Sequence, residues 1–165
     1  MTMISRFGLI LSALFAASSA HAADTTIRAS LWDKGPQSEM MDDARMKMMG
    51  KMDMSMMPMA MMGITLDQAT VPAGKVTFEA INDSKGIIHE MLVAPVPEGT
   101  TELPFVIDEN RVDEEGANYL GEVSELDPGK SGALTVDLTP GTYIVFCNIP
   151  GHFTSGMWTL LTVTP

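Results

Sequence analysis

A thiol, an imidazole and a thioether follow one another at a spacing of five residues near the end of the chain, at Cys147, His152 and Met157. Residues 142–147 are rich in β-branched and aromatic side chains, as are residues 157–163, and both runs have the pattern of a strand. Cys147 therefore ends one predicted strand and Met157 begins the next. The fold must gather these three side chains around one loop at the end of a β-sheet.

Residues 1–22 have the features of a secretory signal peptide. Arg6 precedes an apolar stretch, and small residues surround the expected cut after Ala22. The stretch is too short to span a membrane, and no later segment reaches the ~20 apolar residues that a spanning helix needs. We therefore expect a periplasmic protein that is soluble, monomeric and without a membrane anchor, in which residues 23–165 form a single domain.

The chain has three histidines and one cysteine, and His21 lies in the segment expected to be removed. In an exported protein a lone cysteine has no partner for an internal disulfide, so it is either an unpaired thiol or a metal ligand. One thiolate and two imidazoles with a weakly bound methionine form a type 1, or blue, copper site. We expect one copper ion as the cofactor, bound by His89, Cys147, His152 and Met157.

Two of these ligands have alternative readings. His89 alone could be a structural histidine on an apolar strand. A methionine that opens a strand is often core filler, and Met91, which shares a strand face with His89, competes with Met157 for the axial position. We interpret Met91 as a core residue. An apolar shell that keeps water from the metal is expected from Phe146, Phe153 and Trp158.

Short strand patterns separated by turn residues fill most of the chain and predict an all-β fold, a Greek-key β-sandwich. Segments such as Asp127-Pro-Gly129 and Thr139-Pro-Gly141 have turn chemistry. Residues 99–127 are more acidic and less regular, with a short helix predicted over 108–116. The predicted strands cover residues 25–32, 64–71, 75–82, 89–95, 131–138, 142–147 and 157–163.

Residues 40–62 form a methionine-rich, low-complexity insertion after the first strand, with 12 methionines in 23 residues. Thioethers bind Cu(I) rather than hard cations, and unlike thiols they cannot be lost to disulfides in an oxidising compartment. The alternative is an adaptable apolar linker or a self-association surface. The expected secondary Cu(I) ligands are Met40, Met41, Met46, Met48, Met49, Met52, Met54, Met56, Met57, Met59, Met61 and Met62.

The chain is acidic, with 10 Lys and Arg against 21 Asp and Glu, a net charge of −11. Removal of residues 1–22 takes away Arg6 and no acid, so the count becomes 9 against 21, or −12. This balance argues against nucleic acid, whose phosphates would be repelled. It is compatible with a basic redox or copper-transfer partner, or with solubility alone.

The ligand set and its spacing resemble those of the cupredoxins, the type 1 blue copper proteins, over about residues 64–165. The four-residue gaps on both sides of His152 are similar to those of rusticyanin, auracyanin and sulfocyanin rather than plastocyanin. The resemblance implies His89, Cys147, His152 and Met157 as ligands. In many cupredoxins Asn or Ser follows the first histidine, whereas Glu90 stands here and its backbone N–H could donate to the thiolate.

A methionine-rich stretch beside a blue copper domain resembles the exported bacterial copper-tolerance cupredoxins. We therefore expect a protein that binds Cu(I), and oxidises it or passes it on, in copper tolerance, and that is not an enzyme. The alternative is a soluble one-electron carrier between redox partners. A multicopper oxidase or nitrite reductase would need further histidines, which this sequence lacks.

Overall fold

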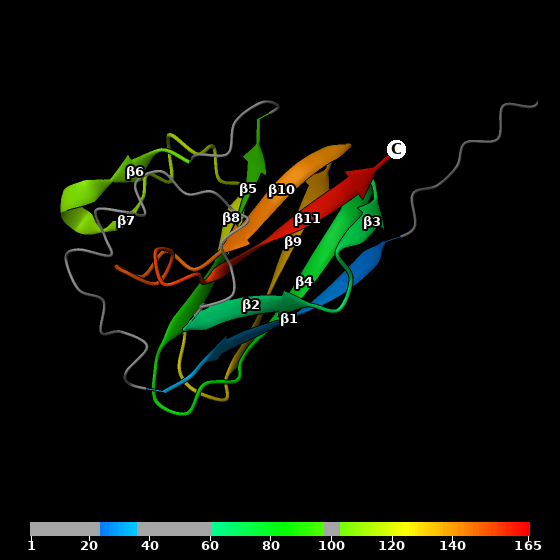
Figure 1. Cartoon of the computed structure of the whole chain (residues 1–165). Helices are drawn as coiled ribbons and strands as arrows, with labels where there is room; N and C mark the ends of the chain where they lie inside the picture. The colour runs from blue at the N-terminus through cyan, green and yellow to red at the C-terminus, as the bar shows by residue number, and fades with distance from the viewer. Residues whose placement is uncertain (1–23, 36–60, 98–102) are drawn as a thin grey trace, which may run out of the picture.

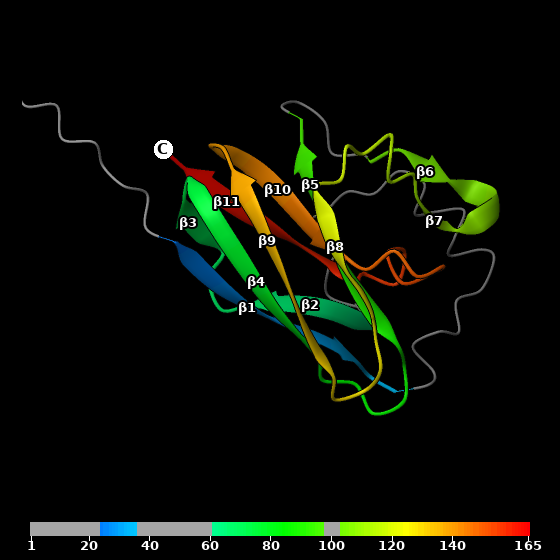
Figure 2. The same ribbon diagram turned by 180° about the vertical axis from the view of Figure 1, so that it is seen from behind.

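The computed structural model describes residues 24–35, 61–97 and 103–165, and these form a β-sandwich of two sheets (Figures 1 and 2). The signal-peptide prediction for residues 1–22 lies outside the described residues, as does most of the methionine-rich segment. The first sheet has the strand order β2-β1-β4-β9. Its strands are β1 (Thr25–Asp33), β2 (Met62–Leu66), β4 (Gly74–Asn82) and β9 (Ser131–Leu138).

The second sheet has the order β3-β11-β10-β5-β8 and carries most of the predicted ligands near one end. Its strands are β3 (Thr70–Pro72), β5 (His89–Val96), β8 (Gly121–Leu126), β10 (Gly141–Phe146) and β11 (Trp158–Thr164). A hairpin of β6 (Phe105–Val106) and β7 (Arg111–Val112) is joined by the short 3₁₀-helix η3 (Ile107–Glu109). Both large sheets are mixed, because β1 pairs with β4 and β11 with β3 in parallel, while their other pairings are antiparallel.

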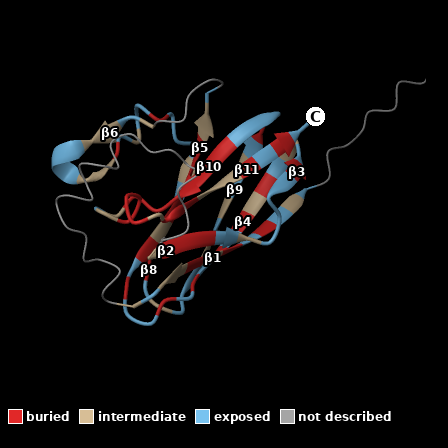
Figure 3. Cartoon of the chain, viewed as in Figure 1, coloured by how far each residue is buried: buried red, intermediate tan, exposed pale blue. Residues whose placement is uncertain are grey.

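The main core lies between the two sheets and follows the period of two that a strand with one buried face requires. On β1, Ile27, Ala29 and Leu31 are fully buried, and the residues between them are less so. Phe78 on β4 and Val145 on β10 reach the same cluster from opposite sheets. Each large apolar side chain buried in this way contributes about 1.5–3 kcal/mol relative to exposure. Figure 3 shows buried residues along the strands of both sheets.

A second apolar cluster covers the outer face of the second sheet. Ile144 and Phe146 of β10 point into it, together with Leu92 of β5 and Val112 of β7. Because the hairpin segment packs on this face, β5 and β10 are buried on both sides and read as nearly continuous apolar runs. Phe146, Phe153 and Trp158 form aromatic contacts here. Cys147 belongs to the main core cluster instead, and the role of these three residues as an apolar shell around the metal stays a prediction.

The strand prediction was right for most elements and wrong in three places. Residues 64–71 form two strands, β2 and β3, rather than one. The helix predicted over 108–116 is wrong, because this stretch contains the end of η3, strand β7 and turns. Strands β6 and β8 were missed within the acidic segment. None of the helices in the described part of the chain has the length and apolar character needed to cross a membrane.

Candidate metal centre

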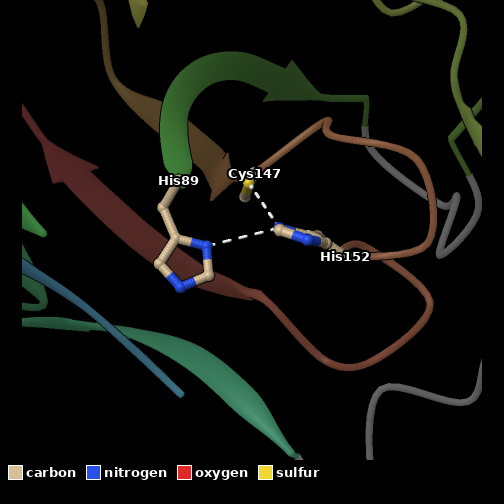
Figure 4. A group of neighbouring side chains, drawn as sticks. All are labelled: His89, Cys147 and His152. Atoms are coloured by element: carbon tan, nitrogen blue, oxygen red, sulfur yellow. Dashed lines mark hydrogen bonds between the residues drawn. The ribbon is translucent and has the colours of Figure 1, made fainter. Parts of the chain in front are cut away.

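The four predicted ligands lie at one end of the second sheet. His89 begins β5, Cys147 directly follows β10, and Met157 directly precedes β11. The antiparallel pairing of β10 with β5 places Phe146 opposite Leu92, and the pairing with β11 places it opposite Trp158. The sheet register therefore brings His89, which is far away in the sequence, to the loop that holds His152 (Figure 4).

A tight turn over residues 149–156 directs His152 back toward Cys147. The His152 N–H donates to the Ile149 carbonyl at 2.9 Å, and the Met157 N–H donates to the His152 carbonyl at 3.1 Å. Gly151 and Gly156 have φ angles of 86° and 94°, in the left-handed region that favours glycine. The two glycines let the chain reverse twice within a few residues.

Three donor atoms converge at this pole of the sandwich. His152 Nδ1 lies 3.3 Å from Cys147 Sγ and 3.3 Å from His89 Nδ1. One donor atom from each residue lies within 4.8 Å of the others, and all three residues are buried. Ligands about 2 Å from a common metal ion lie roughly 3.5 Å from one another. The three side chains are therefore already spaced as the ligands of one ion, as Figure 4 shows.

Met157 is completely buried in the core cluster that also contains Cys147. Its carbonyl accepts the Cys147 N–H at 3.0 Å, so the backbones of the two residues are joined at the start of the loop. Met91 is also fully buried in this cluster, where it pairs with Val123 of β8. Because Met157 is equally buried in the same cluster, the choice of Met157 over Met91 as the axial ligand stays a prediction.

Burial sets the protonation of the donors in the metal-free protein. It raises the pKa of the Cys147 thiol to about 12, so the thiol keeps its proton at neutral pH. Burial, followed by the charge of His89, lowers the pKa of His152 to about 4, so this imidazole is neutral and has a free lone pair. A soft sulfur and two imidazole nitrogens in a dry pocket are the donor set that copper prefers. The residues fit a type 1 copper.

Asp33, the last residue of β1, was missed by the sequence analysis. Its Oδ2 lies 3.2 Å from His89 Nε2, on the side of the ring away from the donor cluster. Carboxylates often hold the second nitrogen of a metal-ligating histidine. No pattern in the sequence identifies Asp33 as this partner.

Glu90 connects the two strands that carry the ligands. Its Oε1 accepts the N–H of Asn148, the residue after Cys147, at 3.0 Å. Burial, together with the nearby charge of Glu125, raises the pKa of Glu90 to about 7. The Asn148 side chain accepts the Val112 N–H and donates to the Val112 carbonyl. These hydrogen bonds attach the ligand loop to both β5 and β7.

A hollow of about 460 Å³ opens beside His152. Carboxylates contribute much of its polar lining, through Glu90, Glu114 and Glu125, and Arg111 also lines it. Arg111 is paired with Glu109, with its Nε 2.7 Å from the Glu109 carboxylate. The apolar part of the hollow includes Ile88, which is 45% exposed.

Comparison with known proteins identifies the family. A family model described as the sulfocyanin (SoxE) domain matches residues 69–165, which include all four predicted ligands. This chain belongs to the sulfocyanin family. It is therefore a cupredoxin, and its family binds one type 1 copper, whose chemistry is one-electron exchange.

The chain is also similar to two other blue copper proteins. It is 45% identical to auracyanin-B of Chloroflexus aurantiacus over 49 residues, which are 29% of this chain and 21% of that protein. The chain thus matches about a fifth of the length of this curated relative. The structure of rusticyanin from Thiobacillus ferrooxidans is 17% identical and superimposes with a TM-score of 0.53, covering 86% of this chain and 77% of that one. This likeness confirms the predicted fold class, a cupredoxin-like Greek-key β-sandwich.

The methionine-rich segment meets the described structure at its C-terminal end. Met62 begins β2 and is fully buried in the main core. Its inclusion among the secondary Cu(I) ligands does not fit this position, because the thioether is packed among apolar side chains. Met61 is partly exposed. The other predicted secondary ligands, from Met40 to Met59, lie outside the described residues.

Proposed function

We propose that this protein is an exported cupredoxin that acts in copper tolerance, with one type 1 copper bound by His89, Cys147, His152 and Met157. The methionine-rich segment would collect cuprous ions close to that copper. A cuprous ion oxidised there would give one electron to the type 1 copper, and a redox partner would then have to remove this electron. The same segment could instead pass Cu(I) to a copper-transfer protein.

One observation supports this proposal above the others: the described residues on either side of residues 36–60, which include most of the methionine-rich segment, contact the region of the predicted ligands. On the N-terminal side, Asp33 at the end of β1 contacts His89. At the C-terminal end, the Met61 N–H donates to the carbonyl of Ser155, which lies between His152 and Met157 in the sequence, at 3.3 Å. The Lys34 N–H also donates to the Met61 carbonyl at 3.0 Å, which joins these two flanking stretches of the chain.

The residues around the cluster have separate tasks in this function. Buried apolar side chains keep water away, Asp33 and Glu90 fix the strands that carry the ligands, and the sandwich holds these elements with little room to move. A rigid site suits one-electron exchange, because both copper oxidation states can then share one geometry.

Anaerobic titration of the mature chain with Cu(I) and Cu(II) tests the proposal. The expected result is one Cu(II) with intense blue absorption and several Cu(I) per chain. A matched variant with the ten methionines from Met40 to Met59 changed to leucine keeps the length and apolar character of the segment. It should keep the blue copper and bind about one Cu(I), and its strain should lose copper tolerance. Full tolerance in that strain would contradict the proposal.

The second candidate function is a soluble one-electron carrier. The hollow beside His152 favours it, because carboxylates from β5, β8 and the segment after β7 surround a path toward a ligand ring. A basic redox partner would be attracted to such a surface, and the acidic net charge would strengthen this attraction. This second function replaces the first under two conditions. The strain with the ten methionine-to-leucine changes must tolerate copper normally, and a strain that lacks the whole protein must fail in electron transport.

Export, the monomeric state and the absence of a membrane anchor are part of the same proposal. The lone cysteine and the signal-like residues 1–22 support export. The mass of the secreted protein tests this, since cleavage after Ala22 would leave residues 23–165. A chain retained in the cytoplasm at full length would contradict it.

A further inference from the structure

The carboxylate of Asp33 is buried and uses both of its oxygens. Oδ2 lies 3.2 Å from His89 Nε2, and the two side chains are 3% and 0% exposed. Oδ1 accepts the backbone N–H of Gly35. One oxygen therefore fixes the carboxylate to the backbone after β1, and the other contacts the imidazole that begins β5.

This contact determines which nitrogen of His89 carries the proton and which carries the lone pair. A carboxylate accepts hydrogen bonds, so the neutral ring places its proton on Nε2, next to Asp33. The lone pair is then on Nδ1, which faces His152 Nδ1 at 3.3 Å. Figure 4 shows this nitrogen directed at the cluster and the other ring nitrogen directed away from it. Asp33 thus selects the tautomer in which His89 can be a ligand.

The charge of Asp33 has a second consequence. A negative charge buried beside a ligand ring stabilises a metal dication more than a monocation, and the low local dielectric leaves the effect poorly screened. The hydrogen bond also makes the imidazole a stronger donor. Both effects favour Cu(II) over Cu(I). The charge should therefore lower the reduction potential.

We propose that Asp33 is a positioning residue that orients His89 and lowers the reduction potential of the copper. The inference rests on the proposed copper site and deepens it by assigning a residue that tunes its potential. It also places a tuning group at the end of β1, seven residues before Met40, where the methionine-rich segment begins.

Asp33→Asn tests the charge, because the amide oxygen can still accept the hydrogen bond while the negative charge is lost. The expected result is a blue protein whose Cu(II)-to-Cu(I) affinity ratio falls about tenfold, a potential about 59 mV more positive for a one-electron couple. Asp67→Asn is the matched control, because it removes one exposed carboxylate that accepts the Arg28 N–H away from the ligands. Equal potentials in the two variants would overturn the proposal.

Asp33→Ala tests the positioning, because both the charge and the acceptor are lost. Nitrogen NMR of the metal-free protein should show the Nε2–H tautomer of His89 in the parent and in Asp33→Asn, and a mixture in Asp33→Ala. Copper affinity should fall about 10–100-fold in the alanine variant. An unchanged tautomer would overturn the positioning role. A parent protein that binds no copper would overturn the proposed function, while the tautomer measurement would still decide the role of Asp33.

Discussion

Cys147 Sγ and His152 Nδ1 lie 3.3 Å apart although four residues separate the two positions, because the turn after β10 folds the histidine back over the end of its own strand. The hydrogen bond from the His152 N–H to the Ile149 carbonyl closes this turn. The local sequence thus brings together two of the three clustered donors. The third, His89, depends on pairing between distant strands.

Cys147→Ser should abolish the blue colour, because the intense absorption requires a thiolate bound directly to copper. The fold should survive, since serine is no larger than cysteine. Its hydroxyl would be buried where the thiol was. Absorption spectra and thermal unfolding of the metal-free protein check the two parts. A blue serine variant would show that the ligand assignment is wrong.

Met157→Leu should leave the blue site assembled and change its potential, because the axial bond is weak but tunes the copper. Met91→Leu is the matched control, since both methionines are fully buried in one cluster. Cyclic voltammetry of both variants shows which of the two methionines is the axial ligand. A shift in the Met91 variant alone would move the axial role to Met91.

Copper binding at pH 7 should release about one proton from Cys147, whose pKa of about 12 keeps the thiol protonated in the metal-free protein. His152, with a pKa of about 4, contributes none at this pH. From these two groups, affinity should rise about tenfold per pH unit above pH 4 and more steeply below it, where His152 must also lose a proton. Titration in a weakly buffered indicator dye measures the release. The Cys147→Ser variant should release no thiol proton, and equal release from it would contradict the assignment.

The ligand spacing and most strands could be predicted from the sequence because both are local patterns. Cys147, His152 and Met157 fall within eleven residues, and turn residues separate the strands around them. The contact between Asp33 and His89 could not be predicted, because it joins residues 56 positions apart through the packing of two sheets. No local pattern marks Asp33 as different from other acids.

The acidic segment misled the prediction for a related reason. Residues 108–116 contain helix-favouring acids, but Arg111 and Val112 pair with β6, and the backbone of Val112 is bonded to Asn148. Tertiary contacts therefore override the local propensity. Strand β8 carries exposed acids on its outer face, and only its pairing with β5 identifies it as a strand.

Asn82→Ala should destabilise the protein by about 3 kcal/mol, because its buried amide donates to the carbonyls of Ile87 and Leu126 and accepts the Ser84 N–H, and all three hydrogen bonds would be lost. This asparagine also holds the loop before His89, so copper affinity should fall with stability. Denaturant unfolding measures the first effect. Thr77→Val, which removes an exposed hydroxyl pair with Thr135, is the control and should cost less than about 1 kcal/mol. Equal costs would show that Asn82 is not a structural anchor.

Deleting residues 40–58 should leave the sandwich and the blue copper intact, because the segment contributes none of the four type 1 ligands. The deletion stops before Met61 and Met62. The backbone of Met61 is hydrogen-bonded to the backbones of Lys34 and Ser155, and Met62 is buried in the core. Cu(I) stoichiometry should fall from several ions to about one, since few other thioethers remain. A longer deletion through Met62 should lower the unfolding midpoint as well, because it removes a core side chain at a cost of about 2–5 kcal/mol. If the shorter deletion also abolished the blue absorption, the segment would have to contribute to the type 1 site itself.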